Sequence, residues 1–289
     1  MKRFTFTPKL GWSVSRYNLF ETCKRQYYYN YYAKYDPVYP AKIILALKSM
    51  TSIPLEIGNI VHDVNKTLLE RLQKTAKAID KARFFDYARK KTQEYVHAKT
   101  FQEVHYGQRK SVGPDDLFGS VRISLESFLN SDRFPWLIDR AVVKKDEWLI
   151  EPPGYGETRI SGTKAYCKVD FLFPVEDQLF IIDWKTGKPD PTKHHRQMVG
   201  YTAWACYHFE KDPDKISPIV AYLHPGYKEI QIHVNASDIE AFARRVRKET
   251  AEMHGFCLNV LKNIPKDKAL FTPKKSRLCH YCNFKALCD

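Results

Sequence analysis

The chain has 289 residues and a formal net charge of +14, because 47 lysine and arginine residues outnumber 33 aspartate and glutamate residues. A hydrophobic fraction of 44% and an aromatic fraction of 14% exclude an intrinsically disordered chain. No apolar run approaches the roughly 18 residues of a membrane span, and the first residues lack a signal-peptide core, so we expect a soluble intracellular protein without a membrane partner. The positive charge indicates a polyanionic partner.

Residues 13–35 are predicted to form one helix, with Ser13 or Ser15 as its cap. This helix carries Cys23 and a run of tyrosines: Tyr27, Tyr28, Tyr29, Tyr31, Tyr32 and Tyr35. Because the tyrosines cover more than one helix face, we expect most of them to pack in the interior and one or two to stack on unpaired bases.

A second helical pattern runs from Ile60 to about Thr100, and Gly58 and His62 lie near its start. A lone histidine among apolar neighbours is more often a packed core residue than a ligand, so His62 by itself fits either role. Farther on, residues 121–129 are predicted to form a helix, and the pattern predicts no role for the rest of residues 101–157.

Two apolar segments, Val169–Val175 and Leu179–Ile182, are separated by a polar break and predict a β-hairpin. Alternation along the second strand places Asp183 and Lys185 on one face. If the strands pair, Asp170 lies close to Asp183, and two carboxylates are available as hard oxygen ligands for Mg²⁺ or Mn²⁺. By itself, an Asp-x-Lys also fits two solvated charges at a strand end.

The segment from His194 to Phe209 has a helical pattern and places Gln197 and Tyr201 on one face. Two further strands are predicted at Ile219–Leu223 and Glu229–Val234, followed by a helix that begins at a capping box, Ser237 to Glu240, and continues to about Lys262. Strands and helices are therefore mixed around a central sheet.

Three cysteines lie close together at the end of the chain, namely Cys279, Cys282 and Cys288, and Cys23 is a possible fourth ligand. Four thiolates can hold a [4Fe–4S] cluster or one Zn²⁺. Disulfide bonds are the structural alternative, which the scattered positions of the other cysteines and the absence of a secretory signal disfavour.

Together these motifs resemble the PD-(D/E)XK nuclease superfamily, and specifically its RecB-like branch. That branch has Gly-x-x-x-His at the start of a helix, an aspartate on one strand, Asp-x-Lys on the next, and Gln-x-x-x-Tyr on the following helix. The matching residues here are Gly58, His62, Asp170, Asp183, Lys185, Gln197 and Tyr201. One position differs: Cys167 stands where the family often has glycine, three residues before the first aspartate.

The resemblance implies an α/β fold with a central mixed sheet flanked by helices, a restriction-endonuclease-like core, a helical N-terminal region and a cysteine-rich tail. It implies that His62, Asp170 and Asp183 bind Mg²⁺ or Mn²⁺, that Lys185 acts on the attacking water, and that Gln197 and Tyr201 position the reacting groups. A subgroup that includes the AddB nuclease domain and the CRISPR-associated adaptation exonucleases holds a [4Fe–4S] cluster with one cysteine before the core and three after it. This favours iron–sulfur over zinc at the cysteines.

The corresponding division of the chain is a mainly helical region (1–157), a nuclease core (158–265) and an iron–sulfur tail (266–289). The implied substrate is DNA, single-stranded or with free ends, in repair, recombination or CRISPR-related defence. No phosphate-binding loop occurs, so no ATP site is expected and a helicase or integrase partner would be a separate chain. Two alternatives stay open: a non-catalytic nucleic-acid-binding module, and a trimming subunit that is active only within a larger assembly.

Overall fold

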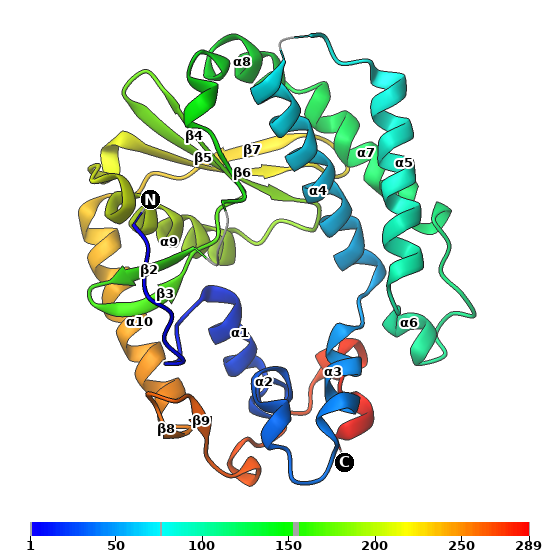
Figure 1. Cartoon of the computed structure of the whole chain (residues 1–289), viewed down its shortest axis with the longest axis vertical. Helices are drawn as coiled ribbons and strands as arrows, with labels where there is room; N and C mark the ends of the chain where they lie inside the picture. Colours follow the sequence, from blue (N-terminus) through cyan, green and yellow to red (C-terminus); the bar gives the residue numbers. More distant parts are fainter. Residues whose placement is uncertain (1, 76, 153–155, 289) are drawn as a thin grey trace. The chain divides into compact units, whose positions relative to one another are not determined.

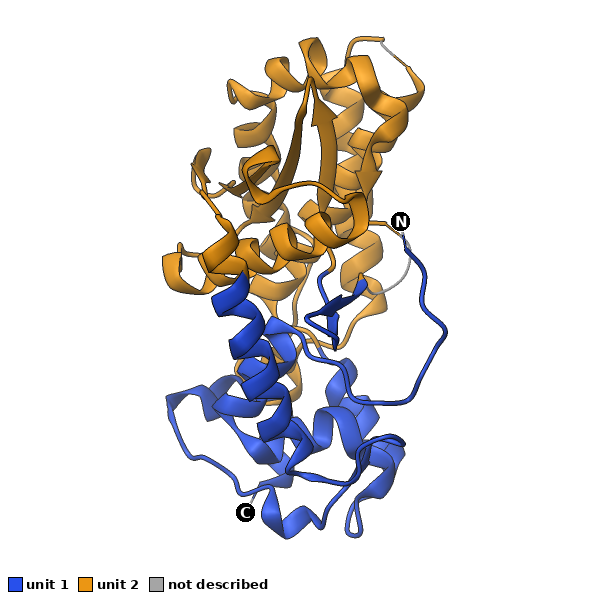
Figure 2. Ribbon diagram, turned by 90° about the vertical axis from the view of Figure 1, so that its left-hand side faces the viewer, with its two compact units in different colours: residues 1–50, 157–167, 240–289 blue, residues 51–156, 168–239 orange. Residues whose placement is uncertain are grey.

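A computed structural model describes residues 2–75, 77–152 and 156–288. The chain divides into two compact units, each assembled from separate stretches of sequence (Figure 2). Unit 1 contains residues 1–50, 157–167 and 240–289, and unit 2 contains residues 51–156 and 168–239. No helix in the described part of the chain is both long and apolar enough to cross a membrane.

Unit 2 is built on a five-stranded mixed sheet with the order β1-β4-β5-β6-β7 (Figure 1). Its strands are β1 (Leu149–Ile150), β4 (Phe171–Val175), β5 (Gln178–Lys185), β6 (Ile216–Tyr222) and β7 (Lys228–Gln231). Strand β5 pairs antiparallel with β4 and parallel with β6. The mixed sheet with helices around it confirms the predicted α/β fold class.

Helices cover both faces of this sheet. The α-helices that lie wholly in unit 2 are α4 (Ile53–Lys74), α5 (Lys81–Ala98), α6 (Gln102–His105), α7 (Asp115–Leu129), α8 (Arg133–Asp139) and α9 (Pro191–Phe209). The face of β5 that carries Ile182 and Trp184 packs against α4 and α7. The opposite face carries Asp183 and is contacted by α9. The period of two along β5 therefore separates a core face from a polar face.

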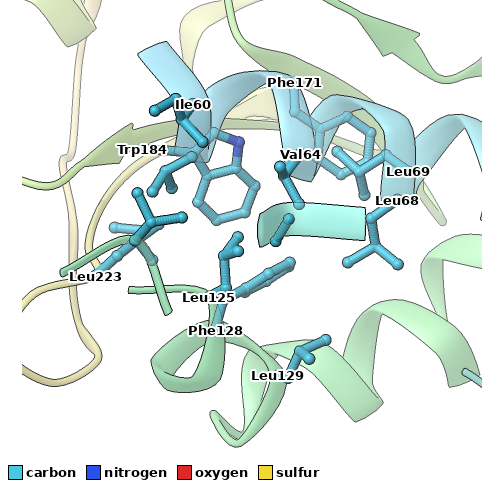
Figure 3. Close-up of a cluster of buried hydrophobic side chains, with 14 of the residues drawn as sticks. Ile60, Val64, Leu68, Leu69, Leu125, Phe128, Leu129, Phe171, Trp184 and Leu223 are labelled. Atoms are coloured by element: carbon cyan, nitrogen blue, oxygen red, sulfur yellow. The ribbon is translucent and has the colours of Figure 1, made fainter. Parts of the chain in front are cut away.

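The core face of β5 is anchored by Trp184, whose side chain is only 2% exposed (Figure 3). Its ring centroid lies 4.7 Å from that of Phe128 on α7, and Ile60 and Val64 of α4 belong to the same cluster. Burying a large apolar side chain contributes about 1.5 to 3 kcal/mol to folding. Since the residues on either side of Trp184 are Asp183 and Lys185, this packing fixes the strand segment that carries them.

Unit 1 contains α1 (Val14–Thr22), α2 (Lys24–Tyr32), α3 (Ala41–Ser49), the hairpin β2 (Glu157–Ile160) and β3 (Thr163–Tyr166), most of α10 (Ala236–His254), and the short strands β8 (Cys257–Asn259) and β9 (Ile264–Pro265). Four tyrosines of α2 are buried, and Tyr31 is 38% exposed. The Tyr29 hydroxyl donates a hydrogen bond to the carbonyl oxygen of Leu287, at 2.9 Å. The buried tyrosines thus attach the C-terminal segment to α2.

Several element boundaries differ from the predicted ones. The single helix expected over residues 13–35 is broken at Cys23, which has an extended backbone (φ −160°, ψ 114°) between α1 and α2. The helical pattern from Ile60 to Thr100 is two helices, because Thr75 is extended and Asp80 caps a new helix by accepting from the backbone N–H of Arg83.

The helix expected to run from Ser237 to about Lys262 also has different ends. Its capping box is formed by Asn235 and Asp238, each of which accepts a hydrogen bond from the backbone N–H of the other, at 3.1 and 3.0 Å. The helix ends at His254 and is followed by Gly255, where a Cβ atom would lie 3.1 Å from the carbonyl oxygen of Glu252.

Candidate nuclease active site

The centre of the candidate site is the carboxylate of Asp183, near the end of β5. Its side chain is 1% exposed. Its Oδ1 atom accepts hydrogen bonds from Gln197 Nε2 at 3.1 Å and from the Tyr201 hydroxyl at 3.3 Å. Its Oδ2 atom forms an ion pair with the ammonium group of Lys185. The structure therefore brings Lys185 of β5 and both Gln197 and Tyr201 of α9 to the same carboxylate, Asp183.

Asp170 lies just before β4 and is held by the backbone of β5. Its Oδ2 atom accepts a hydrogen bond from the Trp184 N–H at 3.0 Å and lies 3.5 Å from His62 Nδ1. The other ring nitrogen, His62 Nε2, lies 3.0 Å from the carbonyl oxygen of Trp184. That carbonyl oxygen therefore contacts the histidine directly, and the sequence pattern did not identify it because every residue has one.

Gly58 lies one turn before His62 on α4, beside the residue that follows Lys185. A Cβ atom at position 58 would lie 3.3 Å from the Thr186 hydroxyl, which is tighter than an ordinary van der Waals contact. A glycine here lets α4 approach the end of β5, and this close approach places His62 beside Asp170.

The two carboxyl groups have pKa values that move in opposite directions. Burial raises the pKa of Asp183 and the charge of Asp170 raises it further, to about 6, although Lys185 and His62 act against this. Burial would also raise the pKa of Asp170, but the charge and hydrogen bond of His62, the charge of Lys185 and the Trp184 N–H together outweigh burial, so the pKa of Asp170 is lowered. For His62, burial lowers the pKa, but Asp170 and then Asp183 outweigh it and raise the pKa to about 9.

Comparison with known proteins places this arrangement in a family. The family model of the PD-(D/E)XK nuclease superfamily matches residues 11–289. The chain belongs to this superfamily. No curated protein sequence matches the chain.

Six solved chains are similar to this PD-(D/E)XK chain. One, titled "Crystal structure of SSO0001", is 16% identical, with 64% of this chain and 77% of the other covered and a TM-score of 0.31. This TM-score is too low to support an argument about the fold or the function.

A groove in unit 2 lies beside His62 and Asp170. Its volume is about 820 Å³, and its lining includes Asn59, Tyr95, Lys99 and Lys168. The Lys168 ammonium lies 3.2 Å from Glu151 Oε2, and Lys99 is exposed. The lining also includes the carboxylates of Asp63, Glu151 and Asp170, so a ligand in this groove would meet both cationic and anionic side chains.

The metal-binding capacity of the site follows from its donor atoms. One imidazole nitrogen, carboxylate oxygens and a backbone carbonyl oxygen are ligands that suit Mg²⁺ and Mn²⁺. As placed in the described chain, no three or more His, Cys, Asp and Glu side chains lie close enough together to hold an ion. Instead, Asp183 is bound to Lys185, and Asp170 lies beside His62.

The four predicted cysteine ligands line one cavity in unit 1. Its volume is about 380 Å³, and Cys23, Cys279, Cys282 and Cys288 all contribute to its wall. The backbone N–H of Lys274 donates to Cys23 Sγ at 3.5 Å, and that of Ser276 donates to Cys279 Sγ at 3.4 Å. Burial raises the pKa of Cys282 to about 11, and the nearby Cys288, Cys23 and Cys279 contribute to this rise. None of the cysteines is in a disulfide bond within the described chain.

Proposed function

We propose that this PD-(D/E)XK protein is a Mg²⁺- or Mn²⁺-dependent deoxyribonuclease of the RecB-like branch, acting as an exonuclease on single-stranded DNA. The observation that carries the proposal is the convergence of Lys185, Gln197 and Tyr201 on one buried carboxylate, Asp183, beside Asp170 and His62. Buried carboxylates are stable only when they are paired with cations; in the structure Lys185 and His62 supply the positive charge, and in this proposal a divalent ion takes over that role.

In this proposal His62, Asp170 and Asp183 hold the divalent ion, together with the carbonyl oxygen of Trp184. The ion would supply charge neutralisation for the phosphodiester and a lower pKa for the attacking water. Lys185 would orient that water and stabilise the charge on the phosphate. Gln197 and Tyr201 fix the orientation of the Asp183 carboxylate through their hydrogen bonds, so their role is positioning.

The preference for a single strand is supported by the groove beside His62 and Asp170. Its volume of about 820 Å³ falls within the range of pockets that hold one small ligand, about 300 to 1,000 Å³. Such a groove fits one or two nucleotides of an unpaired strand better than a duplex. The charge of +14 agrees with a nucleic acid substrate whose binding weakens with salt.

The test is digestion of end-labelled linear single-stranded and double-stranded DNA and of circular single-stranded DNA, with Mg²⁺ or Mn²⁺. We expect release of short products from the linear single strand and no cutting of the circle. Lys185→Ala should lower the rate by about 10² to 10⁴-fold. The matched control is Lys188→Ala, which removes an exposed lysine three residues away and should leave the rate unchanged.

The other outcomes identify the alternatives. Equal cleavage by the Lys185→Ala variant would exclude the proposed site. If the native protein binds DNA but cleaves none of these substrates, it is a binding module. Cleavage that becomes strong only when a helicase or integrase is added would indicate a trimming subunit.

We also propose that Cys23, Cys279, Cys282 and Cys288 hold a [4Fe–4S] cluster that stabilises unit 1. The support is their common cavity of about 380 Å³, which leaves more room than a single Zn²⁺ with sulfur ligands at about 2.3 Å requires. Iron, sulfide and zinc should be measured after anaerobic purification of the native protein, Cys282→Ser and the control Cys206→Ser. We expect about four iron atoms per chain, lost only in the Cys282 variant; stoichiometric zinc in a colourless protein would exclude the cluster.

A further inference from the structure

Two buried side chains beside Lys185 form a hydrogen-bonded pair that the family motifs do not include. His194 Nδ1 and the Tyr222 hydroxyl lie 2.7 Å apart. His194 is 6% exposed and Tyr222 is 3% exposed. Burying two polar groups this deeply costs free energy unless they are hydrogen-bonded, and here each is the partner of the other.

Both residues belong to the face of the sheet that carries Asp183. Strands β5 and β6 are parallel, and their register places Tyr222 directly beside Lys185. Paired residues on neighbouring strands direct their side chains to the same face. His194 lies on α9 three residues before Gln197, so it continues the stripe of α9 that contacts this face.

The hydrogen bond has a defined direction. Burial lowers the pKa of His194, and the charges of Lys185 and Lys193 lower it further, so the imidazole is neutral. The backbone N–H of Asp190 donates to the same Nδ1 atom at 3.4 Å, so Nδ1 is an acceptor. Tyr222 must therefore donate its proton to His194, and its oxygen retains lone pairs that a neighbouring ammonium group can use.

Lys185 needs such an acceptor if Asp183 binds a metal ion. In the structure the Lys185 ammonium is paired with Asp183 Oδ2, one of the oxygens that the proposed function assigns to the divalent ion. The ammonium group and the divalent ion would compete for that oxygen. Lys185 is only 22% exposed, so if its ammonium group left the carboxylate without a new partner, it would be a partly buried, unpaired charge.

We propose that Tyr222, oriented by His194, is the positioning residue that receives the Lys185 ammonium when the Asp183 carboxylate binds a divalent cation. The pair would keep Lys185 within the site instead of letting it turn to solvent. This inference rests on the proposed metal-dependent function, and it adds a specific role for two residues outside the family motifs.

The test is Mn²⁺ binding by isothermal titration calorimetry without DNA, so that no turnover occurs. Tyr222→Phe removes only the hydroxyl and should weaken Mn²⁺ binding by about tenfold, the lower end of the usual effect of such supporting contacts. Lys185→Met removes the competing cation and should strengthen binding. In the Lys185→Met background, Tyr222→Phe should have no further effect, because no ammonium remains to be placed.

Variants of His194 give a second readout. His194→Gln keeps a side-chain oxygen that can accept from Tyr222 and should stay close to the native affinity, whereas His194→Leu should match Tyr222→Phe. Circular dichroism of each variant establishes that it is folded.

Three results would overturn the inference. The first is native Mn²⁺ affinity in the Tyr222→Phe variant. The second is an equal loss of affinity in the Lys185→Met background, which would make the hydroxyl merely structural. The third is a native protein that neither binds Mn²⁺ nor cleaves DNA, which would overturn the proposed function as well. In the first two cases the native protein still binds Mn²⁺ and cleaves DNA, so only the proposed role of Tyr222 is excluded.

Discussion

His62 Nε2 lies 3.0 Å from the carbonyl oxygen of Trp184, so both nitrogens of the histidine ring face an oxygen atom, the second being Asp170 Oδ2 at 3.5 Å. A ring with an acceptor at each nitrogen is favoured in its doubly protonated form. This geometry agrees with the rise of the His62 pKa to about 9, which Asp170 produces against the opposing effect of burial.

The raised pKa predicts how the stability of the metal-free protein depends on pH. The folded state holds the His62 proton more tightly than the unfolded state, where the pKa is 6.5. The stabilisation is therefore complete below pH 6.5 and is lost as the pH rises to about 9, with a slope of at most about 1.4 kcal/mol per pH unit. Denaturation by urea in EDTA at pH 6.5, 7.5 and 8.5 measures this slope. The dependence of the free energy of unfolding on pH should be weaker in His62→Gln. An identical slope in that variant would assign the effect to another group.

Mn²⁺ binding should show the opposite trend. A histidine binds a metal only through a deprotonated nitrogen, so the ion competes with the proton on His62. The affinity of the native protein for Mn²⁺ should rise between pH 6.5 and 9, and this rise should be absent from His62→Gln. An affinity that is constant over this range in the native protein would remove His62 from the metal ligands.

Tyr201 is predicted to act through Asp183, because its hydroxyl lies 3.3 Å from Asp183 Oδ1 and 2.6 Å from Gln197 Nε2. Tyr201→Phe keeps the buried ring and removes the hydrogen bonds. We expect about tenfold weaker Mn²⁺ binding, and DNA cleavage that recovers when the Mn²⁺ concentration is raised. Tyr207→Phe on the same helix is the matched control. Cleavage that excess Mn²⁺ fails to restore would show that Tyr201 acts on the substrate instead.

The glycine of the Gly-x-x-x-His motif is predicted to matter for its small size. In Gly58→Ala the new Cβ atom would lie 3.3 Å from the Thr186 hydroxyl, so Thr186 must shift beside Lys185. We expect the cleavage rate to fall severalfold with little change in stability. Gly119→Ala is the control, since it is also helical, has no atom within 4 Å of the new Cβ atom, and should stabilise the protein by about 0.5 to 1 kcal/mol. Equal rates for the native protein and Gly58→Ala would mean that the close approach is not required.

The sequence was sufficient for the parts of the site that depend on local periodicity. Alternation along β5 places Asp183 and Lys185 on one face, and the helical repeat of α9 places Gln197 beside Tyr201. The roles of these residues stay predictions, as do the proposed ion and the proposed cluster.

Other features depend on information that no local pattern contains. Tyr222 lies beside Lys185 only because of the register of two parallel strands, whose connection runs through the whole of α9. No glycine or proline marks the break at Cys23, so no local pattern predicts it; the rings of Phe20 and Tyr27, one on each side of the break, pack against each other at 5.1 Å. By contrast, the end of α10 could have been predicted, because Gly255 follows its last residue and glycine is common just after a helix.

Tyr29 is predicted to stabilise the cysteine cavity without contributing a ligand. Its hydroxyl donates to the carbonyl oxygen of Leu287, next to Cys288, and its ring lies 5.4 Å from that of Phe284, near Cys282. Tyr29→Phe keeps the ring and leaves the Leu287 carbonyl oxygen without this donor, which should cost about 1 to 3 kcal/mol of stability.

If the cysteines hold a cluster, the less tightly held tail of Tyr29→Phe should also release iron to a chelator faster than the native protein does, as followed by absorbance. The comparison variant is Tyr28→Phe, because the Tyr28 hydroxyl donates to the carbonyl oxygen of Tyr35, just after α2, and not to the cysteine tail. Equal iron release from the two variants would mean that the Tyr29 bond does not hold the cysteine segment in place.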